Sequence, residues 1–281
     1  MQNWSEETAA KWHQHYDDAA SGWAKWADQL ADQQEKVNQA LLAAAGVKQG
    51  SQLLDLASGV GEPAVTAAKL VGDSGQVVAT DASAPMIAAL RQRLDRLGLA
   101  NVRCELADME ALPFSDKAFD AVTCRYGLMY VRDPSKALSE ARRVLRQGGR
   151  VALMVWGPEE ANSVVFHGMR AANEFLGHPI PEADFTAPIR FSEAGLLANI
   201  LTSAGFATVQ EQDIVVEPRI KMGTPFWLPL LEMNATDVWS RLDPTQRKAT
   251  HEAIARAYEP FVVDGSYVLK THIKLVSGRR M

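Results

Sequence analysis

The feature that most constrains the fold is a regular alternation of short apolar segments with helical segments between residues 52 and 156. Strands separated by helices of this length are joined by right-handed crossovers, which place neighbouring strands parallel in one sheet. Because the apolar segments show no polar face, the sheet is expected to carry helices on both sides. Strands are predicted over 52–56, 76–80, 102–107, 119–124 and 150–156, with helices over 62–71 and 85–97 and another from 133 to the Gly148-Gly149 turn.

The chain on either side of this unit determines the expected domain organisation. Four aromatic residues in the first 45 positions recur at helical spacing and therefore fall on one face of a helix. They are Trp12, Tyr16, Trp23 and Trp26. Two late segments, 207–216 and 266–278, have strand character, which predicts an antiparallel pair at the sheet edge. The expected parts are an N-terminal helical lid (1–45), a core (46–216), a helical cap insertion (217–262) and the last edge strand (263–281).

Charge and composition exclude several classes of partner. The formal charge is −5, from 29 basic and 34 acidic residues, and no lysine-rich run is present. A nucleic-acid backbone is bound by clustered Lys and Arg, so we expect no nucleic-acid partner. The first residues are polar, unlike a signal peptide, and no apolar run approaches the ~18 residues of a membrane span. A cytoplasmic protein is expected, with Cys104 and Cys124 reduced and buried in strands.

The turn that runs from Asp55 to Gly61 ends the first strand and opens a helix. Its small residues allow the backbone to approach a ligand closely, and Gly59 and Gly61 permit a positive φ. The helix that follows presents free backbone N–H groups. A tight connection between a strand and a helix needs small residues in any case, so the turn alone does not specify a ligand.

Two further carboxylates make the turn specific. Asp81 lies at the carboxyl end of the second strand and Asp108 just past the third. In an open parallel sheet, ligands bind outside these strand ends, so the carboxylates return to the same rim once per βα unit. The first can accept hydrogen bonds from a ribose diol, and the second can accept one from an exocyclic adenine amine. The spacing therefore predicts a nucleoside-containing ligand.

Four segments together resemble class I S-adenosylmethionine-dependent methyltransferases, and among these the ubiquinone/menaquinone biosynthesis C-methyltransferases. They lie within residues 53–157 and read LLDLASGVGEPA, VVATDASAPMI, ADMEALPFSDKAFDAVTCRYGLMYVRDP and ALSEARRVLRQGGRVALMVWG. The resemblance implies a Rossmann-like α/β fold with a mostly parallel seven-stranded sheet and an antiparallel edge strand. It also implies S-adenosylmethionine as the cofactor and methyl transfer as the activity.

The same resemblance implies roles for the residues on the adenosine side of the cofactor. Asp81 would bind the ribose hydroxyls. The adenine would lie between Ala82 and Met86, and its edge would meet Asp108 and Met109.

On the methionine side, the resemblance places the cofactor against the turn, with the backbone near Arg125 facing its amino group. The turn residues concerned are Asp55, Ala57, Gly59 and Gly61. Ala57 departs from the family pattern, which usually has glycine at that position. Because alanine rarely adopts a left-handed backbone, φ at Ala57 is expected to be negative.

Two other functions fit part of the pattern. Residues 59–64 also match the dinucleotide motif G-x-G-x-x-A, with Asp81 about twenty residues further on, as in NAD-dependent dehydrogenases. The roughly fifty residues before the first strand and the position of Asp108 count against this class. A noncatalytic protein that binds S-adenosylmethionine is the second alternative. The segment after the fourth strand lacks the Asn/Asp-Pro-Pro-Tyr element of DNA amino-methylating enzymes, which favours a small-molecule acceptor.

Acceptor binding is expected at aromatic residues that cover the cofactor. Tyr16 and Trp23 on the N-terminal helix and Tyr126 after the fourth strand are the candidates, with the segment 222–239 as another wall. Such a wall suits an apolar or aromatic acceptor. Methyl transfer requires alignment more than a catalytic triad, so no catalytic residue is assigned, and no metal site is expected. Candidate bases, each more commonly a surface or core-edge residue, are His13, His15, Tyr16, Tyr126 and His167.

Overall fold

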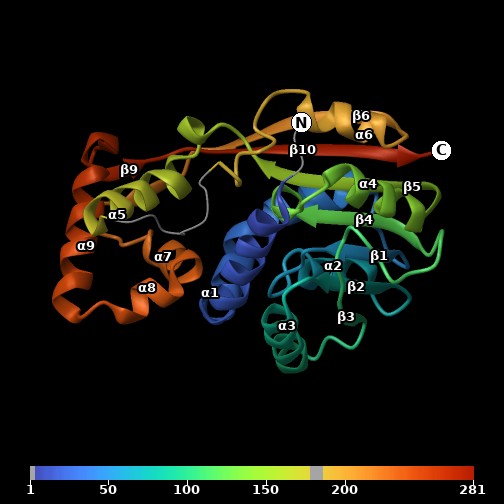
Figure 1. Cartoon of the computed structure of the whole chain (residues 1–281), viewed down its shortest axis with the longest axis horizontal. Helices are drawn as coiled ribbons and strands as arrows, with labels where there is room; N and C mark the ends of the chain where they lie inside the picture. The colour runs from blue at the N-terminus through green and yellow to red at the C-terminus, as the bar shows by residue number, and fades with distance from the viewer. Residues whose placement is uncertain (1–3, 178–185) are drawn as a thin grey trace.

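The computed structural model describes residues 4–177 and 186–281, and a seven-stranded sheet forms its centre (Figure 1). The first three residues of the expected lid and positions 178–185 lie outside the described residues. The strand order is β3-β2-β1-β4-β5-β10-β6, and the first five of these strands pair in parallel. The strands are β1 (Gln52–Leu56), β2 (Gln76–Asp81), β3 (Val102–Leu106), β4 (Phe119–Arg125), β5 (Leu145–Trp156), β6 (Phe206–Val216) and β10 (Thr271–Arg280).

β10, the last strand along the chain, is antiparallel to both of its neighbours in the sheet. β10 pairs with β5 through Leu275↔Met154 and with β6 through Leu275↔Gln212. The mostly parallel seven-stranded sheet and its late antiparallel pair are confirmed. The position of the last strand needs a correction, because β10 lies one place inside the edge and β6 is the edge strand. The burial of β10 explains this position: its residues 273–277 are buried, whereas β6 is mostly exposed or half-buried.

Helices cover both faces of the sheet, as the apolar strands predict. Alternating residues of β1 point to opposite sides, so Leu53 packs under one layer and Leu54 under the other. The first layer consists of α2 (Ala64–Val71), α3 (Ala84–Leu97) and the end of α1 (Glu6–Ala44). The second consists of α4 (Pro134–Val144) and α6 (Leu196–Ser203). The turn that follows β1 thus begins at a strand that is packed on both faces.

The N-terminal segment forms one helix of 39 residues, α1. Ser5 caps its start by accepting a hydrogen bond from the Thr8 backbone N–H. In Figure 1 α1 lies between the sheet on one side and a small helical region on the other. Its middle contains Gly22, which costs helix stability but packs directly against α7 (Leu228–Asn234). The predicted N-terminal helix is therefore present, and it contacts both the sheet layers and the small helical region.

The helical region, here called the cap, has an aromatic core and a small sheet of its own. Trp227, Tyr258 and Tyr267 pack together in this core, and the Tyr258 hydroxyl donates to the Ser163 carbonyl. The expected insertion 217–262 is thus too narrow, since the cap also includes α5 before it and β9 after it. The remaining cap elements are α5 (Gly168–Leu176), α8 (Thr236–Arg241), α9 (Pro244–Ala257), β7 (Arg219–Lys221), β8 (Val262–Val263) and β9 (Ser266–Val268).

Short helical turns complete the described chain. They are the 3-10 turns η1 (Leu128–Tyr130), η2 (Glu159–Ala161) and η4 (Glu259–Phe261), and the π-helical turn η3 (Ser163–His167). In residues 4–177 and 186–281, no helix combines the length and the apolar character needed to cross a membrane.

Candidate functional site

The turn after β1 has a left-handed backbone at three positions. φ is 51° at Ala57, 51° at Gly59 and 115° at Gly61. The expected negative φ at Ala57 is therefore wrong. Hydrogen bonds explain the difference, because the Ser58 N–H donates to the Thr80 carbonyl at 2.8 Å and this bond directs the chain across to β2. For a residue with a Cβ this conformation costs roughly 1–2 kcal/mol, so the surrounding structure must hold it in place.

Asp55 holds the turn from beneath. Its carboxylate is fully buried and accepts hydrogen bonds from the Ser58 hydroxyl at 2.7 Å and the Thr123 hydroxyl at 2.7 Å. Burial raises the pKa of Asp55 to about 7, against the lowering effects of these two hydroxyls and of Arg125. Sequence reasoning placed Asp55 among the residues that contact the ligand. The structure instead places it below the turn, as a support for the backbone.

This raised pKa predicts a pH dependence of stability. An unfolded chain loses the Asp55 proton near its ordinary pKa of about 3.9, whereas the folded chain keeps it up to about pH 7. The stability contributed by the protonated group is therefore complete below about pH 4 and falls by up to about 1.4 kcal/mol per pH unit until about pH 7. Urea unfolding of wild type and Asp55→Asn from pH 4.5 to 7.5 measures it. We expect wild type to lose stability relative to the variant with rising pH; parallel curves would contradict the assignment.

Asp81 connects the end of β2 to the turn. One carboxylate oxygen accepts the Gly59 N–H at 2.8 Å and the other accepts the Ser83 N–H at 2.9 Å. Burial raises the pKa of Asp81 above its ordinary value despite these donors. A Cβ added at Gly59 would meet no atom within 4 Å, so the backbone is open on that side. Asp81 and Gly59, which the sequence spacing brought to one rim, are therefore in direct contact.

The other predicted adenosine-side residues surround this rim. Met86 is buried on the first turn of α3, which Ser83 caps, and Ala82 is exposed beside it. Asp108 is exposed just past β3, with its carboxylate accepting the Glu110 N–H at 2.8 Å, and Met109 is buried behind it. β3 pairs with β2 so that Asp81 faces Leu106, which places the two carboxylates on adjacent strand ends.

Gly61 serves packing. A Cβ at this position would lie 2.7 Å from the Leu90 side chain and 3.2 Å from the Arg93 guanidinium. The residue is buried. The space beside Gly61 is occupied by α3, so its proposed contact with a ligand is not supported by this geometry.

The end of β4 faces the turn. Tyr126 has φ of 58° and its ring stacks on Trp156 with centroids 4.0 Å apart and an interplanar angle of 5°. Next to it, Gly127 lies against Ala57 so closely that an added Cβ would overlap the Ala57 methyl group. Ala57 and Tyr126, at neighbouring strand ends, are thus both left-handed, and such conformations concentrate at functional sites. Gly127 and Trp156 were missed from sequence, because their roles depend on contacts across strands.

The N-terminal helix covers this area with aromatic side chains. Tyr16 and Trp23 pack in one cluster with Val60 of the turn and Met86 of α3. The Tyr16 ring also lies 5.0 Å from that of Tyr130, centroid to centroid. Tyr130 and the buried Trp12, 4.6 Å apart between ring centroids, were not predicted as site residues. The expected aromatic cover over the turn is therefore present, and η1 extends it.

Several buried polar atoms of α1 and of the end of β4 have no hydrogen-bond partner among the described residues. These atoms are Trp12 Nε1, Trp23 Nε1, Asp17 Oδ1, Arg125 Nε and Tyr126 OH. Buried polar groups in proteins are nearly always paired, so these atoms indicate a place that water or a ligand completes. The open side of Gly59, the adjacent Asp81 carboxylate and these atoms fit a polar, nucleoside-containing cofactor beside an aromatic wall.

The candidate bases separate into two groups. His167 lies in the cap, with Nε2 2.8 Å from the Ala257 carbonyl, and is not part of this site. Burial raises the pKa of Tyr16 and of Tyr126, so both phenols stay protonated near neutral pH. His13 is exposed. The His15 ring lies 5.2 Å from the Tyr16 ring, centroid to centroid. The second expected wall needs a correction as well: α7 packs on α1, but the tryptophans of segment 222–239 point into the cap core.

These features define a class of protein, the Rossmann-like methyltransferase fold. A putative methyltransferase from Bacillus halodurans has the same fold, with a TM-score of 0.55, 23% identity and coverage of 86% of this chain and 98% of that chain. The structure of the [4+2]-cyclase SpnF is similar as well, with a TM-score of 0.55, 22% identity and coverage of 87% and 80%.

The sequence comparison is more specific. The profile of the ubiE/COQ5 methyltransferase family matches residues 7–175, more than half of the chain, and the chain belongs to this family. The ubiquinone/menaquinone biosynthesis C-methyltransferase UbiE of Cronobacter sakazakii is 41% identical over 138 residues, which are 48% of this chain and 53% of that protein. The chain spans about half the length of the relatives that it matches.

Proposed function

We propose that this protein binds S-adenosylmethionine and transfers its methyl group to a small-molecule acceptor of mostly apolar or aromatic character. The observation that carries the proposal is the contact between Asp81 and the Gly59 backbone beneath the aromatic face of α1. Membership of a methyltransferase family supports the same activity. Relatives named for ubiquinone/menaquinone biosynthesis support an aromatic acceptor.

The adenosine part is proposed to bind along the rim formed by the ends of β2 and β3. Asp81 would accept hydrogen bonds from the ribose hydroxyls with the lone pairs that its two backbone contacts leave available. Ala82 and Met86 would lie against the adenine. Its edge would meet Asp108 and Met109. The exposure of Ala82 and Asp108 supports this arrangement, because both are accessible at the strand ends.

The methionine part is proposed to lie beside Ala57 and Gly59, with its amino group near the backbone at Arg125. When bound, the cofactor supplies a methyl group on a positively charged sulfur. Removal of that charge in an in-line displacement is favoured where water is excluded and the acceptor is aligned. Tyr16, Trp23 and Tyr126 would exclude water and orient an aromatic acceptor. The raised pKa values of the Tyr16 and Tyr126 phenols support a role in orientation over one in proton removal.

Two measurements on the full chain test this function. Calorimetry with S-adenosylhomocysteine measures cofactor binding, and isotope-labelled methyl transfer to a panel of apolar and aromatic acceptors measures turnover. We expect both to be positive. Tight binding without turnover on a wide panel would favour a noncatalytic cofactor-binding protein. Binding of NAD instead of S-adenosylhomocysteine would favour the dehydrogenase.

The ribose role of Asp81 has a direct test. Asp81→Ala is expected to weaken S-adenosylhomocysteine binding by roughly 1–3 kcal/mol, the usual loss when hydrogen bonds to a charged group disappear. Asp95→Ala, which removes an exposed carboxylate from α3, serves as the charge control and should bind like wild type. Unchanged affinity in a folded Asp81→Ala protein would rule out the ribose contact.

A further inference from the structure

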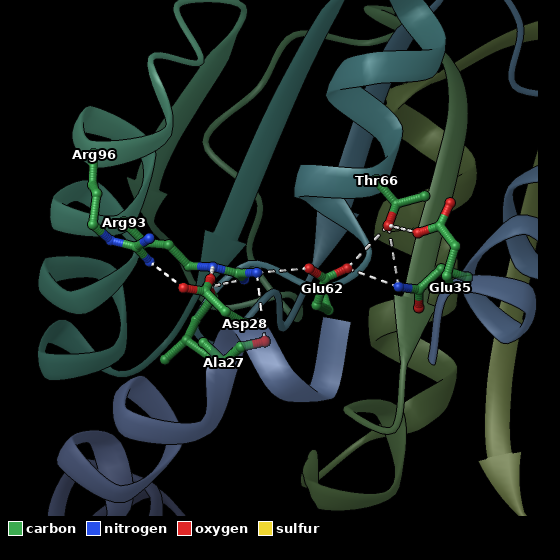
Figure 2. Close-up of polar contacts among 9 residues, drawn as sticks. Ala27, Asp28, Glu35, Glu62, Thr66, Arg93 and Arg96 are labelled. Carbon is green, nitrogen blue, oxygen red and sulfur yellow. Dashed lines mark hydrogen bonds and ion pairs between the residues drawn. The ribbon is translucent and has the colours of Figure 1, made fainter. Parts of the chain in front are cut away.

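A buried arginine joins α1, the glycine turn and α3. Arg93 lies on α3, and its guanidinium points toward Asp28 and Glu62 (Figure 2). Its side chain is only 5% exposed. Its Nε donates to Asp28 Oδ1 at 3.0 Å and its Nη1 to the Val60 carbonyl at 2.9 Å. Its Nη2 donates to Glu62 Oε1 at 3.0 Å and reaches the Ala27 carbonyl at 3.5 Å. One guanidinium therefore contacts α1, Val60 within the turn, and Glu62 directly after it.

Glu62, the acidic partner of Arg93, is itself held by further hydrogen bonds. The Glu62 side chain is 4% exposed, and its second oxygen accepts from the Asn38 amide at 2.7 Å and the Thr66 hydroxyl at 3.2 Å. Asn38 belongs to α1 and is fully buried. The network thus holds α1 at two places ten residues apart, Asp28 and Asn38, and between them holds the segment that carries Gly59 to Glu62.

The Arg93 network is expected to add little to the free energy of unfolding, but it can fix the position of α1 relative to the turn. The hydration energy that two charges lose on burial roughly cancels their mutual attraction. Well-packed apolar residues can therefore replace a buried ion pair without loss of stability. A guanidinium, however, presents its donors in a rigid planar fork, which lysine cannot reproduce. The donors of Arg93 are divided between two segments, α1 and the glycine turn. Movement of α1 away from the turn would break the hydrogen bonds of Arg93 to Asp28 and Ala27 and the bond from Asn38 to Glu62 together. The buried Arg93–Glu62 pair would then lose its partners on the lid helix.

We propose that Arg93 is a positioning residue that fixes the lid helix over the glycine turn in the arrangement that binds the cofactor. This inference rests on the proposed function, since it assigns to the turn the cofactor role argued above. Arg93 touches neither Asp81 nor the aromatic wall, so its influence on binding passes through Val60, Glu62 and α1.

The test compares Arg93→Lys and Arg93→Met with a control on the same helix. Arg96 also pairs with Asp28, at 2.7 Å, but its side chain is 57% exposed and it does not reach the turn. The readouts are S-adenosylhomocysteine affinity by calorimetry and hydrogen exchange of α1. We expect both Arg93 variants to bind roughly tenfold more weakly, as for the loss of one buried hydrogen bond to a charged group, with faster exchange over residues 6–28. Arg96→Met should match wild type in both readouts.

Kinetics separate positioning from a general loss of stability. The Arg93 variants should show a raised KM for S-adenosylmethionine with kcat at saturation changed little, because the reacting atoms are not touched. A folded Arg93→Lys protein with wild-type affinity and wild-type exchange in α1 would overturn the proposal.

Two further arms keep the test decisive. If both Arg93 variants fail to fold, Asp28→Ala cuts the network from the lid side, where the carboxylate is 56% exposed and its loss is tolerable. Faster exchange over residues 6–28 and weaker binding than in Arg96→Met are expected, and equality with Arg96→Met would overturn the proposal.

If wild type binds no S-adenosylhomocysteine, the proposed function fails. Exchange of α1 in Asp28→Ala against Arg96→Met then still decides whether the network holds the lid.

Discussion

Gly127→Ala is expected to abolish detectable cofactor binding and to destabilise the fold by about 1–3 kcal/mol, the range for overpacked sites. Gly127 has φ of −105°, which alanine adopts freely, so the effect is steric. The new methyl group would overlap the Ala57 methyl and lie 3.1 Å from the Cys124 sulfur. Ala57 is already in a left-handed conformation, so the turn has to move. Calorimetry with S-adenosylhomocysteine and urea unfolding measure both effects.

A rescue makes this prediction specific. Ala57→Gly removes the methyl group that Gly127→Ala strikes and also relieves the left-handed strain, so alone it should retain binding and be neutral or stabilising. The double variant should recover most of the affinity and stability lost in Gly127→Ala. A double-mutant cycle measures this coupling. Additive losses in the double variant would show that the contact between these two residues is not what matters.

Gly22→Ala should separate the lid helix from the cap. In an unobstructed helix this change stabilises by about 1 kcal/mol. Here the added methyl group would overlap the Glu232 carbonyl of α7 and lie 2.7 Å from the Thr236 hydroxyl. Displacing α7 also strains the hydrogen bond from Trp26 Nε1 to Glu232, which is 2.7 Å long. We expect a net loss of about 1–3 kcal/mol in urea unfolding, as for other overpacked contacts.

A neighbouring position gives the matched control for this helix. Ser21 is exposed on α1, next to Gly22. Ser21→Ala should therefore change stability by less than about 0.5 kcal/mol, in the direction set by helix propensity. If Gly22→Ala were as stable as Ser21→Ala, the close crossing of α1 and α7 would not exist in solution.

The parts of the fold that sequence predicts well are those set by local pattern. The alternation between residues 52 and 156 gives parallel strands and two helical layers, because apolar periodicity and chain connectivity allow few other arrangements. The spacing of Asp55, Asp81 and Asp108 likewise predicts strand ends on one rim. A cytoplasmic location and the absence of a nucleic-acid partner stay predictions from composition.

The parts that sequence predicts poorly depend on contacts between distant segments. The sign of φ at Ala57 is set by a hydrogen bond to Thr80 and by the neighbouring Gly127. The limits of the cap were wrong because α5 packs on α9 across about eighty residues of chain. Arg93 on an amphipathic helix looks like any exposed basic residue until α1 covers it. Gly22 lies inside a strongly helical segment, where glycine is unfavourable, but the α7 carbonyl that requires it belongs to a segment about two hundred residues away.

The place of β10 has a consequence for the order in which the molecule folds. β6 finds its only sheet partner among the described residues in β10, which is followed on its other side by β5. The helix–strand unit α6–β6 therefore cannot join the sheet until residues 271–280 have been synthesised and inserted beside β5. Pairing over such sequence separations is slow, because a long loop must close before any contact rewards it. The five parallel strands can assemble earlier on the ribosome, with the exposed flank of β5 waiting for a strand made more than a hundred residues later.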